Sequence, residues 1–329
     1  MAKYRDITVT DSPPEASGAA LPRSNATSTP PAALPLVTLN DLLWLLYLYP
    51  IRLLASVLPR WFLYAIGKLS DPIAQFEARR PKAWAAAWIE KACRTTPAQA
   101  RRISSQSLSN TMFRTLDGLL LLRPSYCKML RCTGLDGIEH LESAIGRGKG
   151  VVLLTGHFCA NRVALRYLAS QGHAALSVHG RQPRNRAQGR LGKLFDPLST
   201  QLLERANPDQ IYIQNPDCSL TILRRLRAGG LVALQIDGHR WGTGQVFLGL
   251  PWGIRSGIFE IVRLSDCAVV PMLCLGRSSG FRIRFDPMLD IQRASSRETF
   301  MSANLPRFLG IVEKQILENP TEWRLWNHW

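Results

Sequence analysis

From about residue 150 onward, the chain contains five short apolar blocks, each with the length of one strand. Between the blocks, apolar residues recur at helical spacing, as in Val163, Ala164, Tyr167 and Leu168. This alternation predicts an α/β fold with a mixed central sheet and flanking helices. The blocks expected to form strands are Val151–Leu154, Leu176–His179, Leu231–Ile236, Val269–Leu275 and Phe281–Phe285.

The first part of the chain has a different pattern. Residues 1–38 are rich in Ser, Pro and Ala and poor in bulky apolar groups, which predicts a disordered tail. Residues 39–70 are strongly apolar, with Trp and Tyr of the kind found at membrane interfaces. A full crossing needs roughly 20 apolar residues, and Pro50 and Arg52 interrupt this stretch.

We therefore expect an N-terminal membrane-anchor helix that lies in the bilayer interface or barely spans it. A buried pair of amphipathic helices is the alternative for the same residues. Residues 71–329 are expected to form the α/β domain, entered through helices up to about residue 130. Thr96 and Pro97 mark the start of one of these helices, because threonine caps a helix and proline suits its first turn.

Charge narrows the range of partners. The chain has 41 Lys and Arg against 24 Asp and Glu, a formal net charge of +17. Such a surface favours an anionic membrane face or an acidic carrier protein. Nucleic acid is not expected, because the arginines are spread along the chain and no zinc-finger, RNA-binding-sheet or basic-zipper pattern occurs. Seven cysteines without a Cys-x-x-Cys pair indicate reduced thiols, and no metal or cofactor motif is found.

One histidine stands where the first predicted strand ends. Thr155 and Gly156 follow the apolar run, and His157 comes next, with a helical pattern after it. Carboxyl ends of strands are where catalytic groups gather in α/β folds. If His157 opens the helix, the positive helix end disfavours the protonated ring, which suits a general base. Cys159 is an alternative nucleophile.

The stretch Gly148-Lys-Gly-Val-Val-Leu-Leu-Thr-Gly-His157-Phe resembles a motif of the bacterial lipid A late acyltransferases, the lauroyl/myristoyl branch of the lysophospholipid acyltransferase superfamily. The segments Gly137-Ile-Glu-His-Leu and Gln235-Ile-Asp237 and the tryptophan-rich end of the chain resemble further parts of these enzymes. In that family an acid follows the histidine by five residues, and here that position holds Arg162.

The resemblance implies roles for several residues. His157 would take a proton from the acceptor, and Asp237 is our first choice for the acid that orients it. Glu204 or Glu260 could serve instead, or His157 could act without an acid. The residues expected to bind anionic parts of the substrates are Arg162, Arg181, Arg184, Arg240 and Arg255.

The implied reaction moves a fatty acyl chain from acyl carrier protein or coenzyme A to a hydroxyl or amine of a lipid A-like or other glycolipid acceptor. The implied location is the cytoplasmic face of the bacterial inner membrane, and no metal or redox cofactor is expected. Because Arg162 replaces the family's acid, the alternative is a catalytically degenerate homologue that binds acyl chains or pathway partners. An acyl hydrolase that uses the same histidine and water is a third interpretation.

Overall fold

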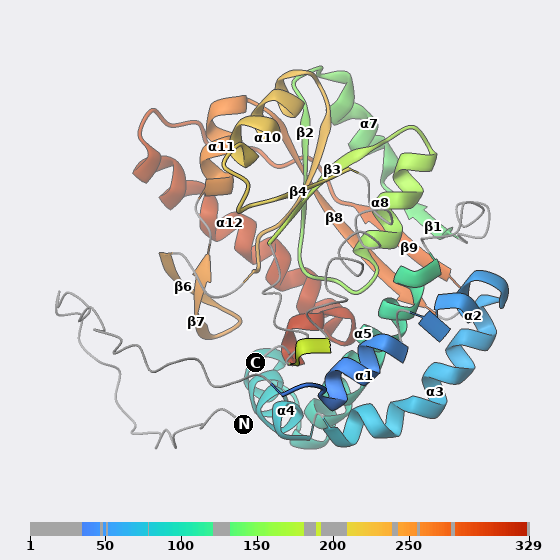
Figure 1. Ribbon diagram of the computed structural model, residues 1–329. Coiled ribbons are helices and arrows are strands. Elements are labelled where there is room, and N and C mark those ends of the chain that lie inside the picture. The colour runs from blue at the N-terminus through green and yellow to red at the C-terminus, as the bar shows by residue number, and fades with distance from the viewer. Residues whose placement is uncertain are drawn as a thin grey trace. The chain divides into compact units, whose positions relative to one another are not determined.

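The structure is a computed structural model that describes residues 35–46, 49–50, 52–77, 79–120, 132–180, 189–191, 209–238, 243–254, 257–277 and 280–327. Its centre is a seven-stranded sheet with the strand order β1-β9-β8-β2-β5-β3-β4 (Figure 1). The strands are β1 Cys132–Asp136, β2 Val151–Thr155, β3 Ala175–His179, β4 Gln210–Tyr212, β5 Leu231–Gln235, β8 Ala268–Arg277 and β9 Gly280–Phe285.

The sheet is mixed, as predicted. Strands β8, β2, β5, β3 and β4 are parallel neighbours, whereas β9 pairs antiparallel with β8 and parallel with β1. All five predicted strands are present as β2, β3, β5, β8 and β9. Every residue of β2 is buried, because a parallel strand in the middle of a sheet is covered on both faces.

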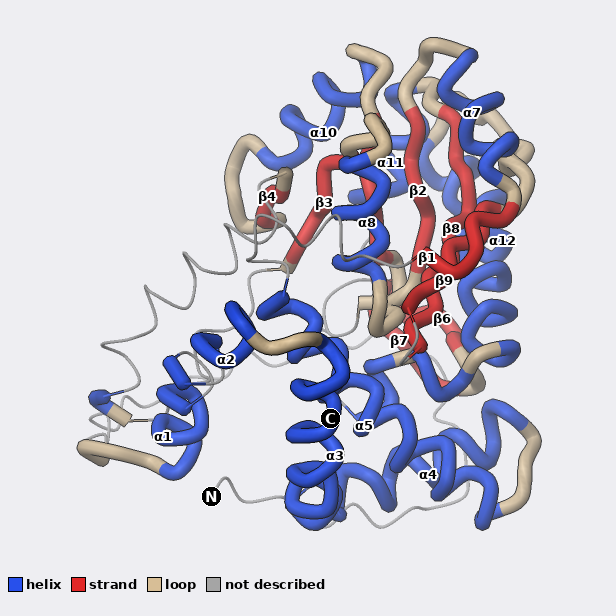
Figure 2. The backbone as a smooth tube through the Cα atoms, turned by 90° about the vertical axis from the view of Figure 1, so that its right-hand side faces the viewer, coloured by secondary structure: helices blue, strands red, loops and turns tan. Residues whose placement is uncertain are grey.

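Two groups of helices cover the two faces of this sheet (Figure 2). On one face, α7 (Ile138–Gly146) and α8 (Asn161–Ser170) pack with Val151 and Leu153 of β2. On the other face, Val152 and Leu154 pack in a second cluster, to which the helices of that face contribute. This alternation follows from the two-residue period of a strand. The helices on the second face are α10 (Cys218–Arg227), α11 (Gly257–Ser265) and α12 (Arg297–Glu318).

A layer of helices precedes the sheet in the chain. It consists of α1 (Leu39–Leu46), α2 (Arg52–Val57), α3 (Arg60–Glu77), α4 (Arg79–Cys93) and α5 (Pro97–Leu120). Helix α5 begins where the sequence predicted. It packs against the end of the chain, the short helices η2 (Pro320–Glu322) and η3 (Arg324–Asn327). The Ser107 hydroxyl donates to the carbonyl oxygen of Trp323 at 2.8 Å.

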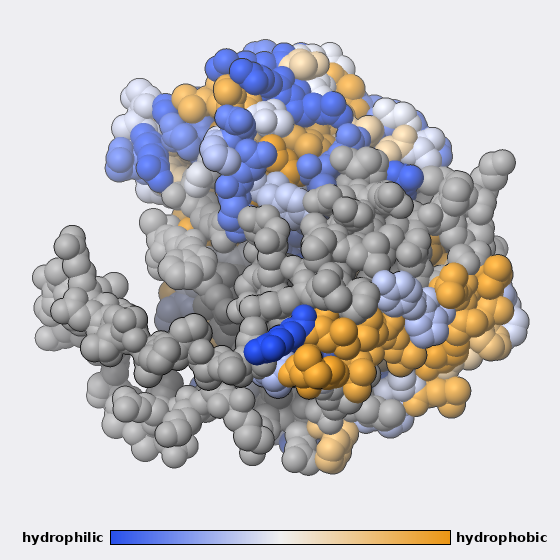
Figure 3. Space-filling model, in the orientation of Figure 1, coloured by the Kyte–Doolittle hydropathy of each residue, from blue (hydrophilic) through white to orange (hydrophobic). Residues whose placement is uncertain are grey.

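Where the structure describes it, the apolar stretch 39–70 is divided among α1, α2 and the first part of α3. Within the ranges described above, none of the helices combines the length and the hydropathy that a bilayer crossing requires. Large apolar side chains are nevertheless exposed along these helices, and Figure 3 shows them gathered on one face. They include Leu42, Leu46, Leu53, Val57, Trp61, Phe62 and Leu69. Of the predicted tail, residues 1–34 lie outside the described residues.

The glycine-rich segment after β5 ends in a hairpin of β6 (Thr243–Phe247) and β7 (Leu250–Ile254). Its two-residue turn is Leu248-Gly249, and both residues have positive φ, 51° and 76°. Positive φ at both positions gives a turn whose twist matches that of the strands. The Glu313 carboxylate accepts from the Leu248 N–H at 2.5 Å, so α12 holds this turn.

Candidate active site

His157 and Asp237 meet at the carboxyl edge of the sheet. Each follows its strand by two residues, and Thr155 of β2 pairs in register with Gln235 of β5. Because β2 and β5 are parallel neighbours, the two residues emerge side by side. His157 Nδ1 lies 2.6 Å from Asp237 Oδ1, and the His157 backbone N–H donates to Asp237 Oδ2 at 2.7 Å. Asp237 is fully buried, and 16% of the His157 side chain is exposed.

His157 does not open a helix, contrary to our prediction. Helix α8 begins at Asn161, four residues later, with Ala160 as its N-cap residue. Phe158 instead pairs with Trp323 in an isolated bridge, and Cys159 and Ala160 form a turn before the helix starts. The helix dipole therefore does not act on His157 from its first turn, and the nearest fixed charge is the carboxylate of Asp237.

The electrostatics of Asp237 fix the tautomer of His157. Burial is the largest single influence and raises the pKa of the Asp237 carboxyl, whereas the charge of His157 lowers it. Hydrogen bonds from the His157 ring, from Trp323 and from the His157 backbone lower the pKa further, so it lies below its ordinary value. An ionised carboxylate only accepts hydrogen bonds, so Nδ1 of a neutral His157 must carry the proton. The lone pair is then on Nε2, which can accept a proton from a substrate.

Trp323 is a site residue to which the sequence analysis gave no role. Its indole N–H donates to Asp237 Oδ2 at 2.6 Å, across 86 positions of the sequence. The same segment holds the loop that carries the histidine. The Arg324 N–H donates to the His157 carbonyl at 3.1 Å, and the Cys159 N–H donates to the Glu322 carbonyl at 3.0 Å. The sequence feature that could have indicated a role for this segment is the presence of three tryptophans among its last seven residues.

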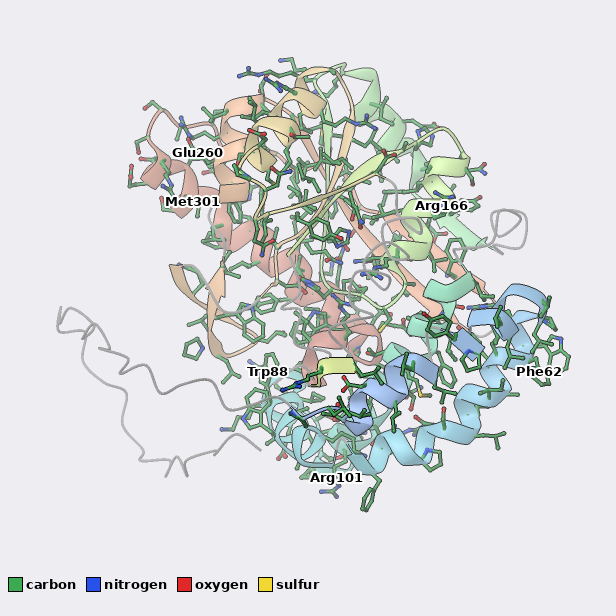
Figure 4. All side chains as sticks on the ribbon, in the orientation of Figure 1. Phe62, Trp88, Arg101, Arg166, Glu260 and Met301 are labelled. Atoms are coloured by element: carbon green, nitrogen blue, oxygen red, sulfur yellow. The ribbon has the colours of Figure 1, made fainter. Side chains whose placement is uncertain are left out.

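An aromatic cluster encloses the Asp237 side of the pair. Trp88 from α4, labelled in Figure 4, lies 5.2 to 5.4 Å from the rings of Trp252 and Trp323 and 4.6 Å from Trp326. The Trp252 indole N–H donates to the carbonyl oxygen of Asp237 at 3.1 Å. Such a cluster excludes water and keeps the carboxylate in one orientation, because its polar N–H groups are all directed to fixed partners.

Position 156 requires glycine because Asp237 approaches the backbone closely there. A Cβ at this position would lie 3.0 Å from Asp237 Oδ2 and 3.0 Å from Val312 Cγ1, which is tighter than ordinary contact. The Gly156 carbonyl accepts from Asn161 Nδ2 at 2.6 Å, and this bond ties the first residue of α8 to the strand end. The motif Thr155-Gly156-His157 thus lets the carboxylate of Asp237 approach the backbone of the loop.

The other predicted site residues have different outcomes. Arg162 lies in the first turn of α8, and its side chain is exposed. Glu260, one alternative acid, pairs with Arg263 on the same helix. Among the candidate acids that the structure describes, Asp237 is the one in contact with His157. Five predicted residues lie outside the described part of the chain: Arg181, Arg184, Glu204, Arg240 and Arg255.

The alternative nucleophile Cys159 lies in an unfavourable environment. Burial, and then the charge of Glu322, raises the pKa of its thiol to about 12. Its Sγ is 3.7 Å from the Thr111 hydroxyl. A thiolate is the reactive form of cysteine, so this thiol is poorly suited to nucleophilic attack.

Two surface depressions lie away from His157. One, of about 450 Å³, is lined by Gln245 of β6 and residues of α12 such as Met301 and Leu305. The other, of about 550 Å³, lies along α3 and α5 and is lined by polar side chains such as Gln75 and Arg102. Neither includes the His157–Asp237 pair, which we regard as the site on chemical grounds.

Comparison with protein families gave a match. A family model described as bacterial lipid A biosynthesis acyltransferase matches residues 41–329. The match includes β2, β5 and the tryptophan-rich end, the three segments that build the site. Comparison with curated proteins gave no match.

Proposed function

Because the chain belongs to the bacterial lipid A biosynthesis acyltransferase family, we propose that it transfers a fatty acyl chain from a thioester donor to a hydroxyl or amine of a lipid acceptor. Acyl carrier protein and coenzyme A are the two donors that fit this chemistry. The observation that carries the proposal is the 2.6 Å contact between His157 Nδ1 and the buried carboxylate of Asp237. It gives His157 an orienting acid although Arg162 stands five residues after it.

The chemistry follows from the tautomer. Nε2 of His157 takes the proton of the acceptor O–H or N–H as the acceptor atom attacks the thioester carbonyl carbon. The tetrahedral intermediate then collapses, the C–S bond breaks, and the thiolate takes the proton from the imidazolium. Asp237 remains ionised throughout and stabilises the imidazolium at Nδ1, as the carboxylate of a hydrolytic triad does.

Membrane association is part of the proposal. The exposed apolar side chains on α1, α2 and α3 supply a face that could enter the acyl region of one leaflet. The formal charge of +17 adds attraction to anionic headgroups. Phe62 of α3 points outward at the edge of the structure in Figure 4. An acceptor lipid could then reach the site without leaving the bilayer.

The degenerate-homologue alternative depended on the loss of the acid at position 162. Asp237 weakens that dependence, because this acid, which follows β5, already contacts His157 Nδ1. The hydrolase alternative keeps the same base and differs in the acceptor, which would be water. Both alternatives are separated from the proposal by the product that is formed.

The test is acyl transfer followed by mass spectrometry. Purified protein and its His157→Ala variant are incubated with acyl carrier protein thioesters, and separately with coenzyme A thioesters, together with total inner-membrane lipid. We expect a new acylated lipid that is absent with the variant. Free fatty acid without an acylated lipid would indicate the hydrolase, and tight acyl-chain binding without either product would indicate the degenerate homologue.

A further inference from the structure

One face of α5 carries polar side chains where α5 packs against the end of the chain. Helix α5 lies beside η2 and η3 (Figure 2), which contain the terminal segment, residues 321–324. A helix face that packs against other elements is ordinarily apolar, so a polar one needs specific partners for its side chains. The polar residues of this face recur three and four positions apart and are Ser107, Asn110, Thr111 and Arg114.

Two of these side chains bind three consecutive residues of the terminal segment. Asn110 Nδ2 donates to the carbonyl oxygen of Thr321 at 2.9 Å and to Glu322 Oε1 at 3.0 Å. The hydroxyl of Ser107, which is fully buried, donates to the carbonyl oxygen of Trp323 at 2.8 Å. The segment is thereby fixed to one helix.

The carboxylate of Glu322 joins three elements at one point. Its Oε1 accepts from Asn110 of α5, and its Oε2 accepts from the Gly276 N–H of β8 at 3.2 Å. The side chain is buried, and one donor at each oxygen fits an ionised carboxylate, which only accepts hydrogen bonds. A Cβ at Gly276 would overlap the guanidinium group of Arg114. A positive charge therefore lies against the residue that donates to Glu322.

The terminal segment in turn holds both members of the catalytic pair. The loop that carries His157 makes two backbone hydrogen bonds to it, one to the Glu322 carbonyl at 3.0 Å and one from the Arg324 N–H at 3.1 Å. Between these residues, Trp323 donates its indole N–H to Asp237. All three bonds lie within two residues of Glu322, so a displacement of its carboxylate is transmitted to the base and to its acid.

Resting on the proposed function, we propose that Glu322 and Asn110 are positioning residues for acyl transfer. Their hydrogen bond fixes the terminal segment, and the terminal segment fixes His157 against Asp237. They act through this segment and not on the substrates. Hydrogen bonds between buried partners specify one arrangement of the elements that they join. Precision of this kind matters, because a misplacement of about 1 Å at a reacting group can cost about 10²-fold in rate.

Glu322→Gln is the first test. An amide offers one oxygen and one NH₂ group, so it cannot accept from both Asn110 and Gly276. We expect kcat for acyl transfer to fall at least about 10-fold with KM for donor and acceptor unchanged, since no substrate contact is altered. NMR of the substrate-free full chain should show a shifted His157 Nδ1–H signal, assigned by its loss in His157→Ala. A purely stabilising role would move neither kcat of the folded protein nor this signal.

Glu318→Gln is the matched control. Glu318 lies four residues before Glu322, is exposed and pairs with Arg284. It undergoes the same change of charge, and both kcat and the His157 signal should stay as in the wild type. If Glu322→Gln does not fold, Asn110→Ser removes the donor to Oε1 and leaves the bond from Gly276, and it is measured in the same way.

An exchange of the two groups tests the contact itself. Asn110→Asp places a second carboxylate against that of Glu322 and should lower kcat at least about 10-fold. Adding Glu322→Gln to it lets the new amide donate to the new carboxylate, so the double variant should have a higher kcat than Asn110→Asp alone. Each rate is measured below the unfolding temperature of that variant. A double variant no better than Asn110→Asp would overturn the proposal.

The positioning role and the proposed function fail separately. The NMR comparison needs no substrate, so an unmoved His157 signal in folded Glu322→Gln would overturn the positioning role whatever the rate. Absence of acyl transfer by the wild type, together with a shifted signal in the variant, would contradict the proposed function alone.

Discussion

Replacing Asp237 by Asn tests how the carboxylate controls His157. Three N–H groups meet the two oxygens of Asp237: the His157 ring at Oδ1, and the His157 backbone and the Trp323 indole at Oδ2. An amide offers one oxygen and one NH₂ group. The oxygen of Asn must take the place of Oδ2, where two donors point, so the NH₂ group faces His157 Nδ1.

That orientation forces the other tautomer of the ring. Nδ1 must then accept a hydrogen bond, the proton moves to Nε2, and the base is lost. In hydrolytic triads the same exchange lowers turnover about 10⁴-fold, which is about 5.5 kcal/mol of activation free energy. Each hydrogen bond whose charged acceptor is replaced by a neutral one becomes weaker by about 1 kcal/mol. The neutral amide is cheaper to bury, so we expect the free energy of unfolding to fall by only about 1–2 kcal/mol.

The assay is single-turnover acyl transfer combined with urea unfolding at pH 7. Asp266→Asn is the control, because Asp266 is an exposed aspartate with φ of 52°, a conformation that asparagine tolerates. Nitrogen NMR of the ring should show the Nε2–H form in Asp237→Asn. A transfer rate within 10-fold of wild type, with that tautomer present, would refute the reasoning.

Four further predictions concern the surroundings of the pair. Trp323→Phe keeps an aromatic ring but removes the indole N–H, whose hydrogen bond to a charged acceptor is worth about 1.5–3 kcal/mol. The pKa of the Asp237 carboxyl, which is lowered in the folded protein, should therefore rise in the variant. The stability that ionised Asp237 contributes is lost as the pH falls through this pKa, so acid unfolding should show the loss at a higher pH than in the wild type. The Cβ added by Gly156→Ala would lie 3.0 Å from Asp237 Oδ2, whereas the Cβ added by Gly146→Ala would have no atom within 4 Å. Only Gly156→Ala should lower the transfer rate, by at least about 10-fold, and destabilise the protein by about 1–3 kcal/mol. His179 has a pKa of about 4 in the folded protein, so between pH 6.5 and 4 it binds fewer protons in the folded state than in the unfolded state. The free energy of unfolding should therefore fall by about 3 kcal/mol as the pH falls across that window. Unfolding measured at several pH values should show that His179→Gln removes this pH dependence. Arg162→Glu should lower the transfer rate and not raise it, because Asp237 already occupies Nδ1; a gain above the wild-type rate would show that the arginine only replaces a missing acid.

The strands could be predicted because their signals are local. The runs around Val152 and Val232 are buried on both faces, and each ends two residues before a polar group. Parallel neighbours bring such ends together, and the resemblance of Gln235-Ile-Asp237 to the family made Asp237 the first choice for the acid. Strands β1 and β4 were not predicted, since Gln210–Tyr212 is three residues long and Cys132–Asp136 has no apolar run.

What the sequence could not predict depends on distant partners. The start of α8 moved from His157 to Asn161 because Phe158 pairs with Trp323, 165 positions away by residue number. The indole bond to Asp237 also crosses the chain. Helix α12 was not predicted, and Pro306 inside it interrupts the local helical signal. Tertiary contacts decided each of these features.

The measurement that tests the central claim most directly is the rate of acyl transfer to membrane lipid by His157→Ala relative to wild type, from one thioester donor. The account predicts a fall of at least about 10³-fold, within the range for loss of a positioned base and its coupled acid, in variant protein that remains folded. Transfer by His157→Ala at the wild-type rate would contradict it.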